Sequence, residues 1–265
     1  MEDKEIVFLV GSVIKPIPGE FAMQFGNTQN RSAQTPSERA QQTILSLNSI
    51  FCKYPNAKVF LLEGSLDLSL TELKELCEPS CNSNSSYFSR HNIEIIQISE
   101  VDNDVCKKIN THQNKSYCEA LLFNTFLERF EDKIKDYDYI VKLSGRYSLT
   151  PNCNINTLSG TNKIYFKNYN FYDYVDRIVC HESICLPEQN QCTLYWTPCF
   201  MFIFGNEKID DLKLFFKFLV SVTEETKVST EDTIQYWLKT QNIINEPLSW
   251  AALAYTGTYG AFWYY

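Results

Sequence analysis

The chain has 265 residues, of which 44% are hydrophobic and 21% are charged, and its formal net charge is -8. This length and composition fit a large folded domain and exclude a disordered chain. The negative charge argues against wrapping a nucleic acid, because clustered Lys and Arg side chains supply that affinity. No window approaches 18 consecutive apolar residues and the N-terminus is acidic. We therefore expect no transmembrane span, no signal peptide and a cytoplasmic protein.

The first half of the chain alternates apolar runs with amphipathic segments. Runs rich in β-branched and aromatic residues predict strands at 5–11, 57–64, 93–98 and 136–147. Helical periodicity predicts helices at 36–50, 69–77 and 117–130. Polar segments at 12–35 and 80–92 are expected to be loops. Strands that alternate with helices predict βαβ units and hence a parallel sheet.

The second half of the chain shows a different order of elements. Strands are predicted at 163–167 and 194–205, helices at 210–221 and 230–240, and a β-like aromatic segment at 250–265. We therefore predict an α/β fold with a mostly parallel, Rossmann-type central sheet, flanking helices and a mixed C-terminal sheet portion. The prediction is one domain, 1–265, with halves at 1–150 and 151–265. The aromatic run at 262–265 is open to three interpretations: it covers the sheet, contacts a partner or meets a membrane surface.

Ten cysteines are many for a chain expected to stay in the cytoplasm. Those at 52, 77, 106 and 118 fall in helical segments, where a thiol is most often a small buried hydrophobe. A second group, Cys180, Cys185, Cys192 and Cys199, is clustered but lacks the paired C-x-x-C spacing of structural zinc sites. We expect reduced thiols.

Several catalytic motifs are missing from the sequence. There is no G-x-x-x-x-G-K-[ST] phosphate loop, no G-x-G-x-x-G fingerprint, no H-E-x-x-H zinc helix and no G-x-S-x-G nucleophile elbow. The three histidines leave few members for a His-based triad. These absences argue against hydride transfer, P-loop hydrolysis and serine hydrolysis.

The segment 136–147, DYDYIVKLSGRY, is a predicted buried strand that ends in small, cationic and aromatic residues. Open α/β sheets place their ligands at the carboxyl ends of strands. Lys142, Ser144 and Arg146 are two apart and therefore share one face of an extended strand. Lys and Arg side chains bind phosphate oxygens, so this face is a candidate diphosphate site. The alternative is a salt bridge to Asp136 or Asp138.

Two further polar groups precede predicted helices. Arg31 and Arg39 flank the start of the helix at 36–50, where the helix N-terminus itself favours anions; ordinary helix-start chemistry is the equal alternative. Asn114 and Lys115 precede the helix at 117–130. Ser116-x-x-Glu119 fits a capping box, which leaves Asn114 and Lys115 for a ligand.

Thr230-Glu231-Asp232 begins the last predicted helix. Helix capping with favourable acidic charges explains these residues as well as function does. As function, a carboxylate at the mouth of a sugar pocket can accept a proton from an attacking hydroxyl. Asp232 is the first candidate for this base, with Glu231 beside it.

The helix start at 37–50, the Asn114-Lys-Ser segment and the 138–147 block together resemble nucleotide-sugar-dependent glycosyltransferases with the GT-A fold, of the small bacterial and large-DNA-virus type. The resemblance covers residues 5–240 in the order of elements. It implies transfer of a sugar from a nucleotide-sugar donor to a hydroxyl of a glycan, glycolipid or glycoprotein acceptor, as in glycan biosynthesis.

The resemblance also implies roles for the candidate residues. Gly11 and Ser12 would line the base and ribose side, and Asn114 and Lys115 would contact the donor sugar. The family's acidic base at a late helix start maps onto Glu231 or Asp232. The diphosphate would meet Arg39, Lys142 and Arg146, with Arg31 and Ser144 near them.

The chain departs from that family's pattern at the metal-binding motif. The family's acidic D-x-D motif normally holds Mg²⁺ or Mn²⁺ against the diphosphate, and Ser144-Gly145-Arg146 stands in its place. We therefore expect cationic side chains to neutralise the diphosphate in place of a metal, with bound Mn²⁺ or Mg²⁺ as the alternative. The alternatives are a nucleotidyltransferase acting on sugar phosphates and a non-catalytic carbohydrate- or protein-binding module.

Overall fold

A computed structural model gives the structure of the chain. It describes residues 4–22, 28–30, 32, 34–78, 87–166, 169–170, 195–196, 199–225, 230–241, 245–248, 252–256 and 261–264.

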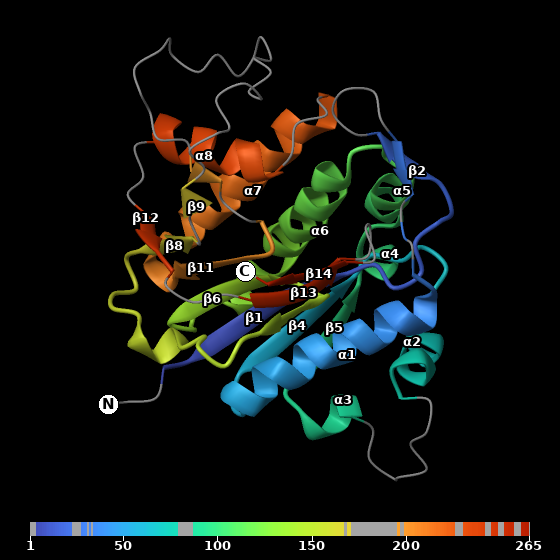
Figure 1. Ribbon diagram of the computed structural model, residues 1–265, viewed down its shortest axis with the longest axis horizontal. Helices are drawn as coiled ribbons and strands as arrows, with labels where there is room; N and C mark the ends of the chain where they lie inside the picture. Colours follow the sequence, from blue (N-terminus) through green and yellow to red (C-terminus); the bar gives the residue numbers. More distant parts are fainter. Residues whose placement is uncertain are drawn as a thin grey trace.

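A seven-stranded sheet in the order β12-β8-β11-β6-β1-β4-β5 forms the centre of the structure (Figure 1). The strands β5, β4, β1 and β6 are parallel to one another. On the far side of β6, β11 is antiparallel to β6 and β8, and β12 is parallel to β8. The predicted α/β class, with a parallel first half and a mixed second half, is confirmed. The strands are β1 (Ile6–Ser12), β4 (Lys58–Glu63), β5 (Ile93–Gln97), β6 (Tyr139–Ser144), β8 (Ile164–Phe166), β11 (Met201–Gly205) and β12 (Asn245–Pro247).

Helices cover both faces of this sheet (Figure 1). One face carries α1 (Pro36–Lys53), α2 (Leu70–Cys77) and α3 (Tyr87–Arg90). The other carries α4 (Ile98–Val101), α5 (Asn103–Thr111), α6 (Lys115–Phe130), α7 (Ile209–Glu225) and α8 (Thr230–Thr240). Short 3-10 turns lie at Glu131–Lys133, Ile155–Thr157 and Asn206–Lys208.

Three small sheets complete the structure. In the first, β13 (Ala252–Thr256) pairs with both β7 (Tyr147–Leu149) and β14 (Ala261–Tyr264), which confirms the β-like end of the chain. The second joins β9 (Tyr169–Asn170) to β10 (Tyr195–Trp196), and the third joins β2 (Glu20–Ala22) to β3 (Thr28–Asn30). None of the described helices combines the length and apolar character needed to cross a bilayer.

The central strands are buried on both faces, as their unbroken apolar runs predict. In β1, Val7 and Leu9 join the core under α6 and α7, whereas Phe8 and Val10 join the core under α1. This alternation follows from the two-residue period of a strand. Packing on both faces therefore fixes the positions of the strands and of the residues at their carboxyl ends.

The predicted strand at 136–147 is wrong at its end. The strand β6 stops at Ser144, a turn occupies Gly145 and Arg146, and β7 begins at Tyr147. The Gly145 N–H donates to the Gly11 carbonyl at 2.8 Å. A Cβ on Gly145 would stand 2.7 Å from that oxygen, so the close approach of the turn to β1 requires glycine.

Other differences from the sequence predictions are local. The polar segment 12–35 contains the hairpin of β2 and β3, and 80–92 contains α3. The helices α4 and α5 were not predicted, because the segment 98–111 is short and largely polar. Cys52 is exposed rather than buried, whereas Cys106 and Cys118 are buried as expected. Cys180, Cys185 and Cys192 lie outside the described residues.

We expect Gly145→Ala to destabilise the protein by about 1–3 kcal/mol, because the added methyl group would overlap a backbone oxygen that cannot move out of the sheet. Chemical denaturation of the two proteins measures this change in the free energy of unfolding. Ser37→Ala, at an exposed position of α1, is the control and should change it by less than about 0.5 kcal/mol. Equal stability of Gly145→Ala and the unsubstituted protein would contradict the prediction.

Candidate functional site

A pocket of about 150 Å³ opens at the carboxyl edge of β1 and β6. The loop after β1 forms one wall, and residues from α1, α5, α6 and α8 form the others. This is the edge at which open α/β sheets bind ligands. The residues that line it are Gly11, Ser12, Val13, Pro16, Arg39, Thr43, Ile109, Asn110, Lys115, Cys118, Glu119, Leu122, Ser144, Gly145, Arg146, Tyr147, Cys199 and Glu231.

Arg39 brings a nearly buried guanidinium to the pocket from α1. The helix begins with a capping box in which Thr35 and Glu38 satisfy each other's backbone N–H groups, and Arg39 follows at once. Its Nε donates to the Val13 carbonyl at 2.7 Å, and its Nη1 donates to Ser32 Oγ at 3.1 Å. Burial and the nearby positive charge of Arg146 lower the pKa of Arg39 to about 9, although the negative charge of Glu63 acts to raise it. The guanidinium therefore remains charged at neutral pH.

Two more cations, Lys115 and Arg146, line the same pocket. Protein atoms crowd the Lys115 ammonium, and Arg146 repels it, so the pKa of Lys115 is lowered despite the opposing charges of Glu119 and Glu231. Lys115 lines the pocket, and the residue as a whole is exposed to solvent. Arg146 thus repels both Arg39 and Lys115. An anion bound among these three cations would relieve that repulsion.

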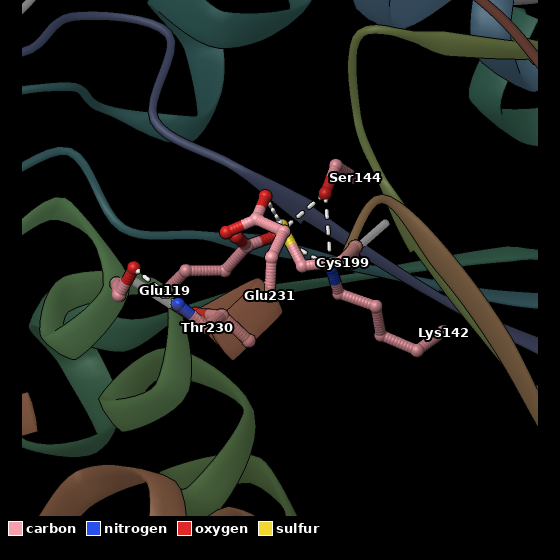
Figure 2. Close-up of polar contacts among 7 residues, drawn as sticks. Glu119, Lys142, Ser144, Cys199, Thr230 and Glu231 are labelled. Atoms are coloured by element: carbon pink, nitrogen blue, oxygen red, sulfur yellow. Dashed lines mark hydrogen bonds and ion pairs between the residues drawn. The ribbon is translucent and has the colours of Figure 1, made fainter. Parts of the chain in front are cut away.

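Lys142 does not line the pocket but lies beneath it, 2% exposed. Its ammonium donates to Glu119 Oε1 at 2.7 Å, to Ser144 Oγ at 2.9 Å and to the Cys199 carbonyl (Figure 2). These bonds use all three N–H donors of a lysine. The predicted diphosphate contact of Lys142 is therefore not supported. Lys142 does form a salt bridge, as the alternative interpretation predicts, but its partner is Glu119. Asp138, one of the predicted partners, accepts the Glu5 N–H at 3.0 Å.

Glu119 does not form the predicted capping box with Ser116. Asn114 is the N-cap of α6, and its Oδ1 accepts from the Ser116 N–H at 2.9 Å. Glu119 points instead at the sheet, where its Oε1 accepts from Lys142 and from Ser144 Oγ at 2.6 Å. Burial acts to raise the pKa of Glu119, but the charge and hydrogen bond of Lys142, with Ser144 and Lys115, lower it overall.

The start of α8 carries a second carboxylate into the pocket. Ser116 Oγ accepts from the Thr230 N–H at 3.0 Å, which ties the first residue of α8 to α6. Glu231 follows and lines the pocket, where the Cys199 thiol donates to its Oε1 at 3.0 Å (Figure 2). Burial, then the charges of Glu231 and Glu119, raise the pKa of Cys199 well above its usual value, so the thiol keeps its proton.

Asn114 is buried and takes a structural role. Its Nδ2 donates to the Thr223 carbonyl at 2.9 Å, and its Oδ1 caps α6. Because both ends of the amide are used within the protein and Asn114 does not line the pocket, the predicted donor-sugar contact of Asn114 is not supported.

The pocket brings together seven of the residues singled out from the sequence: Gly11, Ser12, Arg39, Lys115, Ser144, Arg146 and Glu231. Lys142 and Asn114 support its walls without lining it. Arg31 lies outside the described residues, and so does the side chain of Asp232, which follows Glu231 in α8.

Thr43, Asn110 and Cys199 also line the pocket although they were not predicted from the sequence, and Glu119 has a different role from the predicted one. A signal existed for two of them, since Thr43 is four residues after Arg39 and Glu119 is four after Lys115, which places each pair on one helix face. No local pattern marks Cys199, because its partners Glu231 and Lys142 are distant in sequence.

The residues at the position of the D-x-D motif do not fit a divalent metal. Ser144 offers a hydroxyl already bonded to Lys142 and Glu119, and the Arg146 guanidinium would repel a cation. Among the described residues, no group of three or more His, Cys, Asp or Glu side chains could hold a metal ion.

Solved structures of glycosyltransferases align with this chain at low sequence identity. No protein-family model and no curated protein matches the sequence. A galactosyltransferase, LgtC, in complex with donor and acceptor sugar analogues aligns over 89% of this chain and 70% of its own, with 11% identity and a TM-score of 0.44. An active-site mutant of LgtC aligns over 88% of this chain and 69% of its own, with 11% identity and a TM-score of 0.43.

The bifunctional glycosyltransferase WbbM, in its apo structure, aligns over 94% of this chain and 40% of its own, with 12% identity and a TM-score of 0.48. These neighbours are named as glycosyltransferases. At such identities and TM-scores, the likeness assigns no reaction and no residue role to this chain.

We expect Cys199 to react slowly with iodoacetamide at pH 7.5, because its raised pKa leaves little thiolate. Peptide mass spectrometry after timed labelling measures the rate, with the exposed Cys52 as the internal control. Glu231→Gln removes a negative neighbour, so it should lower the pKa of Cys199 and speed its labelling. Labelling of Cys199 as fast as that of Cys52, or no change in Glu231→Gln, would contradict the prediction.

Proposed function

We propose that the chain is a glycosyltransferase that moves a sugar from a nucleotide-sugar donor to an acceptor hydroxyl. The observation that carries this proposal is the gathering of Arg39, Lys115 and Arg146 around one pocket that also holds the Glu231 carboxylate. Cations suit a diphosphate leaving group, and a carboxylate suits the proton of an attacking hydroxyl. Both requirements of glycosyl transfer are thus available within one pocket.

The diphosphate would lie against Arg39 and Arg146. Arg39 is held by the Val13 carbonyl, so its guanidinium is positioned before a ligand arrives. Pre-oriented cations stabilise the charge that develops on a leaving nucleoside diphosphate. An anion here would also relieve the repulsion between Arg39, Arg146 and Lys115. These side chains would do the work that the D-x-D metal does in the family that the sequence resembles.

The base and ribose would lie beside Gly11 and Ser12, at the end of β1. Both residues line the pocket, and Ser12 is followed by Val13, whose carbonyl holds Arg39. Arg31, which precedes α1 in the sequence, belongs to the same proposal as a further cation.

Glu231 would act as the base. It takes the proton of the acceptor hydroxyl as the acceptor oxygen bonds to the anomeric carbon of the sugar. The bond from that carbon to the phosphate oxygen breaks, and the nucleoside diphosphate leaves with the electron pair. Asp232, the first candidate from the sequence, becomes the alternative base. The acceptor hydroxyl would belong to a glycan or a lipid-linked acceptor.

Binding of nucleoside diphosphates tests the proposal directly. Thermal shift with UDP, GDP, ADP and CDP and with UDP-glucose and GDP-mannose should raise the melting temperature for at least one nucleotide, with or without Mn²⁺. We expect Arg146→Ala to weaken that binding by about ten-fold or more, because a charged hydrogen-bond donor to phosphate is lost. Lys107→Ala, at an exposed position of α5, is the matched control and should bind normally.

The outcomes of this experiment separate the candidate functions. A pure carbohydrate- or protein-binding module predicts no stabilisation by any of these nucleotides. A nucleotidyltransferase predicts preference for nucleoside triphosphates with a metal. Full affinity of Arg146→Ala would remove the diphosphate role of Arg146.

Glu231→Gln tests the base. We expect kcat for sugar transfer to fall by about 10²–10⁴-fold, because Gln cannot accept the proton. The affinity for the nucleoside diphosphate should be unchanged, since Glu231 does not contact the phosphates in this proposal. Steady-state kinetics and calorimetry measure the two quantities. If the variant keeps its kcat, the base lies elsewhere, and Asp232→Asn is then the variant to measure.

A further inference from the structure

Resting on the proposed function, we propose that Glu119 binds hydroxyl groups of the transferred sugar and thereby sets the direction in which a nucleotide sugar lies in the pocket. The sugar would meet Glu119 and Glu231, and the diphosphate would meet Arg39 and Arg146. This assignment gives Glu119 a specificity-determining role in place of the donor-sugar contact expected from Asn114.

The geometry of Glu119 leaves one carboxylate oxygen for a ligand. Its Oε1 accepts from Lys142 Nζ at 2.7 Å and from Ser144 Oγ at 2.6 Å, which fixes the orientation of the carboxylate (Figure 2). No described residue bonds to its Oε2. The Glu119 side chain is 22% exposed and lines the pocket, whereas the side chain of its partner Lys142 is buried and does not. The ion pair therefore presents its anionic end to the pocket.

An ionised carboxylate accepts hydrogen bonds and donates none. The pKa of Glu119 is lowered overall, because Lys142, Ser144 and Lys115 together outweigh burial, so the group stays ionised at neutral pH. Sugar hydroxyls can donate to it. A diphosphate near neutral pH offers mainly oxygens with negative charge, which Glu119 would repel.

Charge therefore divides the pocket into two parts. Hydrogen bonds connect Glu119 to Glu231 by way of Lys142 and Cys199 (Figure 2). Lys142 donates to Glu119 and to the Cys199 carbonyl, and the Cys199 thiol donates to Glu231. Arg39 and Arg146 are close enough to each other for their charges to interact. Lys115 interacts with both groups, with Arg146 on one side and with Glu119 and Glu231 on the other. A nucleotide sugar has the same division, a charged diphosphate joined to a neutral, hydroxyl-rich ring.

A purely structural role for Glu119 is the alternative, since a buried lysine needs a partner. The variant Glu119→Gln separates the two roles. Its amide oxygen can still accept from Lys142 and Ser144, but it lacks the negative charge and the strong acceptor. The double variant Glu119→Gln with Lys142→Met removes both charges of the pair, so it avoids leaving a lone buried ammonium.

The experiment is calorimetry with UDP and UDP-glucose, and with GDP and GDP-mannose. We expect Glu119→Gln to bind the nucleoside diphosphate as tightly as the unsubstituted protein or more tightly. The affinity for the matching nucleotide sugar should fall by about ten-fold, because charged hydrogen bonds to the sugar are lost. The ratio of the two affinities is the readout, and a merely structural role would not move it. Glu128→Gln, at an exposed position of the same helix and outside this pocket, is the control and should keep the ratio.

The outcomes distinguish failure of the sugar contact from failure of the proposed function. A ratio that changes by ten-fold or more in Glu119→Gln, or in the double variant if the single one does not fold, supports the sugar contact. An unchanged ratio in a folded variant that binds the nucleoside diphosphate overturns it and leaves the proposed function standing. If the unsubstituted protein binds none of these nucleotides, the proposed function fails and the role of Glu119 fails with it.

Discussion

The pocket depends on the ion pair and hydrogen bonds of the buried Lys142 ammonium. A charge that is 2% exposed is stable only if its surroundings supply compensating partners, and three elements do so. Glu119 comes from α6, Ser144 from the end of β6, and the Cys199 carbonyl from the segment before β11. One side chain thus fixes the pocket's floor, one of its helices and the thiol that contacts Glu231.

The cations on the opposite wall are held by a different means. Arg39 is anchored through its Nε to a backbone carbonyl, and no described carboxylate lies within salt-bridge distance of it. The fold therefore keeps Arg39 near Arg146 although their charges repel each other. Such an arrangement costs stability in the free protein and is typical of a site prepared for an anion. The contrast with Lys142, whose charge is fully paired, separates the cation that supports the pocket from the cations that face it.

Strand and helix positions follow from the sequence wherever the periodicity is strong, because apolar residues every two or every 3.6 positions must face a core. The shared face of Lys142 and Ser144 was predictable for the same reason. The role of Glu119 was not. Ser116-x-x-Glu119 satisfies a local capping rule, but Thr230, 114 residues away, bonds to Ser116, and Lys142 takes Glu119. Local rules cannot detect partners that only the folded chain brings near.

The segment from Lys142 to Arg146 shows why one motif contains residues of different function. Polar residues at every second position share a face, so the depth of each in the sheet decides what it can meet. Lys142 lies inside the edge of the sheet, where water is excluded and only protein groups can pair with its charge. Ser144 is the last residue of β6 and contacts both the buried pair and the pocket. Arg146 lies beyond the strand, in the turn that Gly145 allows, and lines the pocket. Position relative to the sheet edge, rather than residue type alone, therefore decides that Lys142 supports the pocket and that Arg146 is available to a ligand.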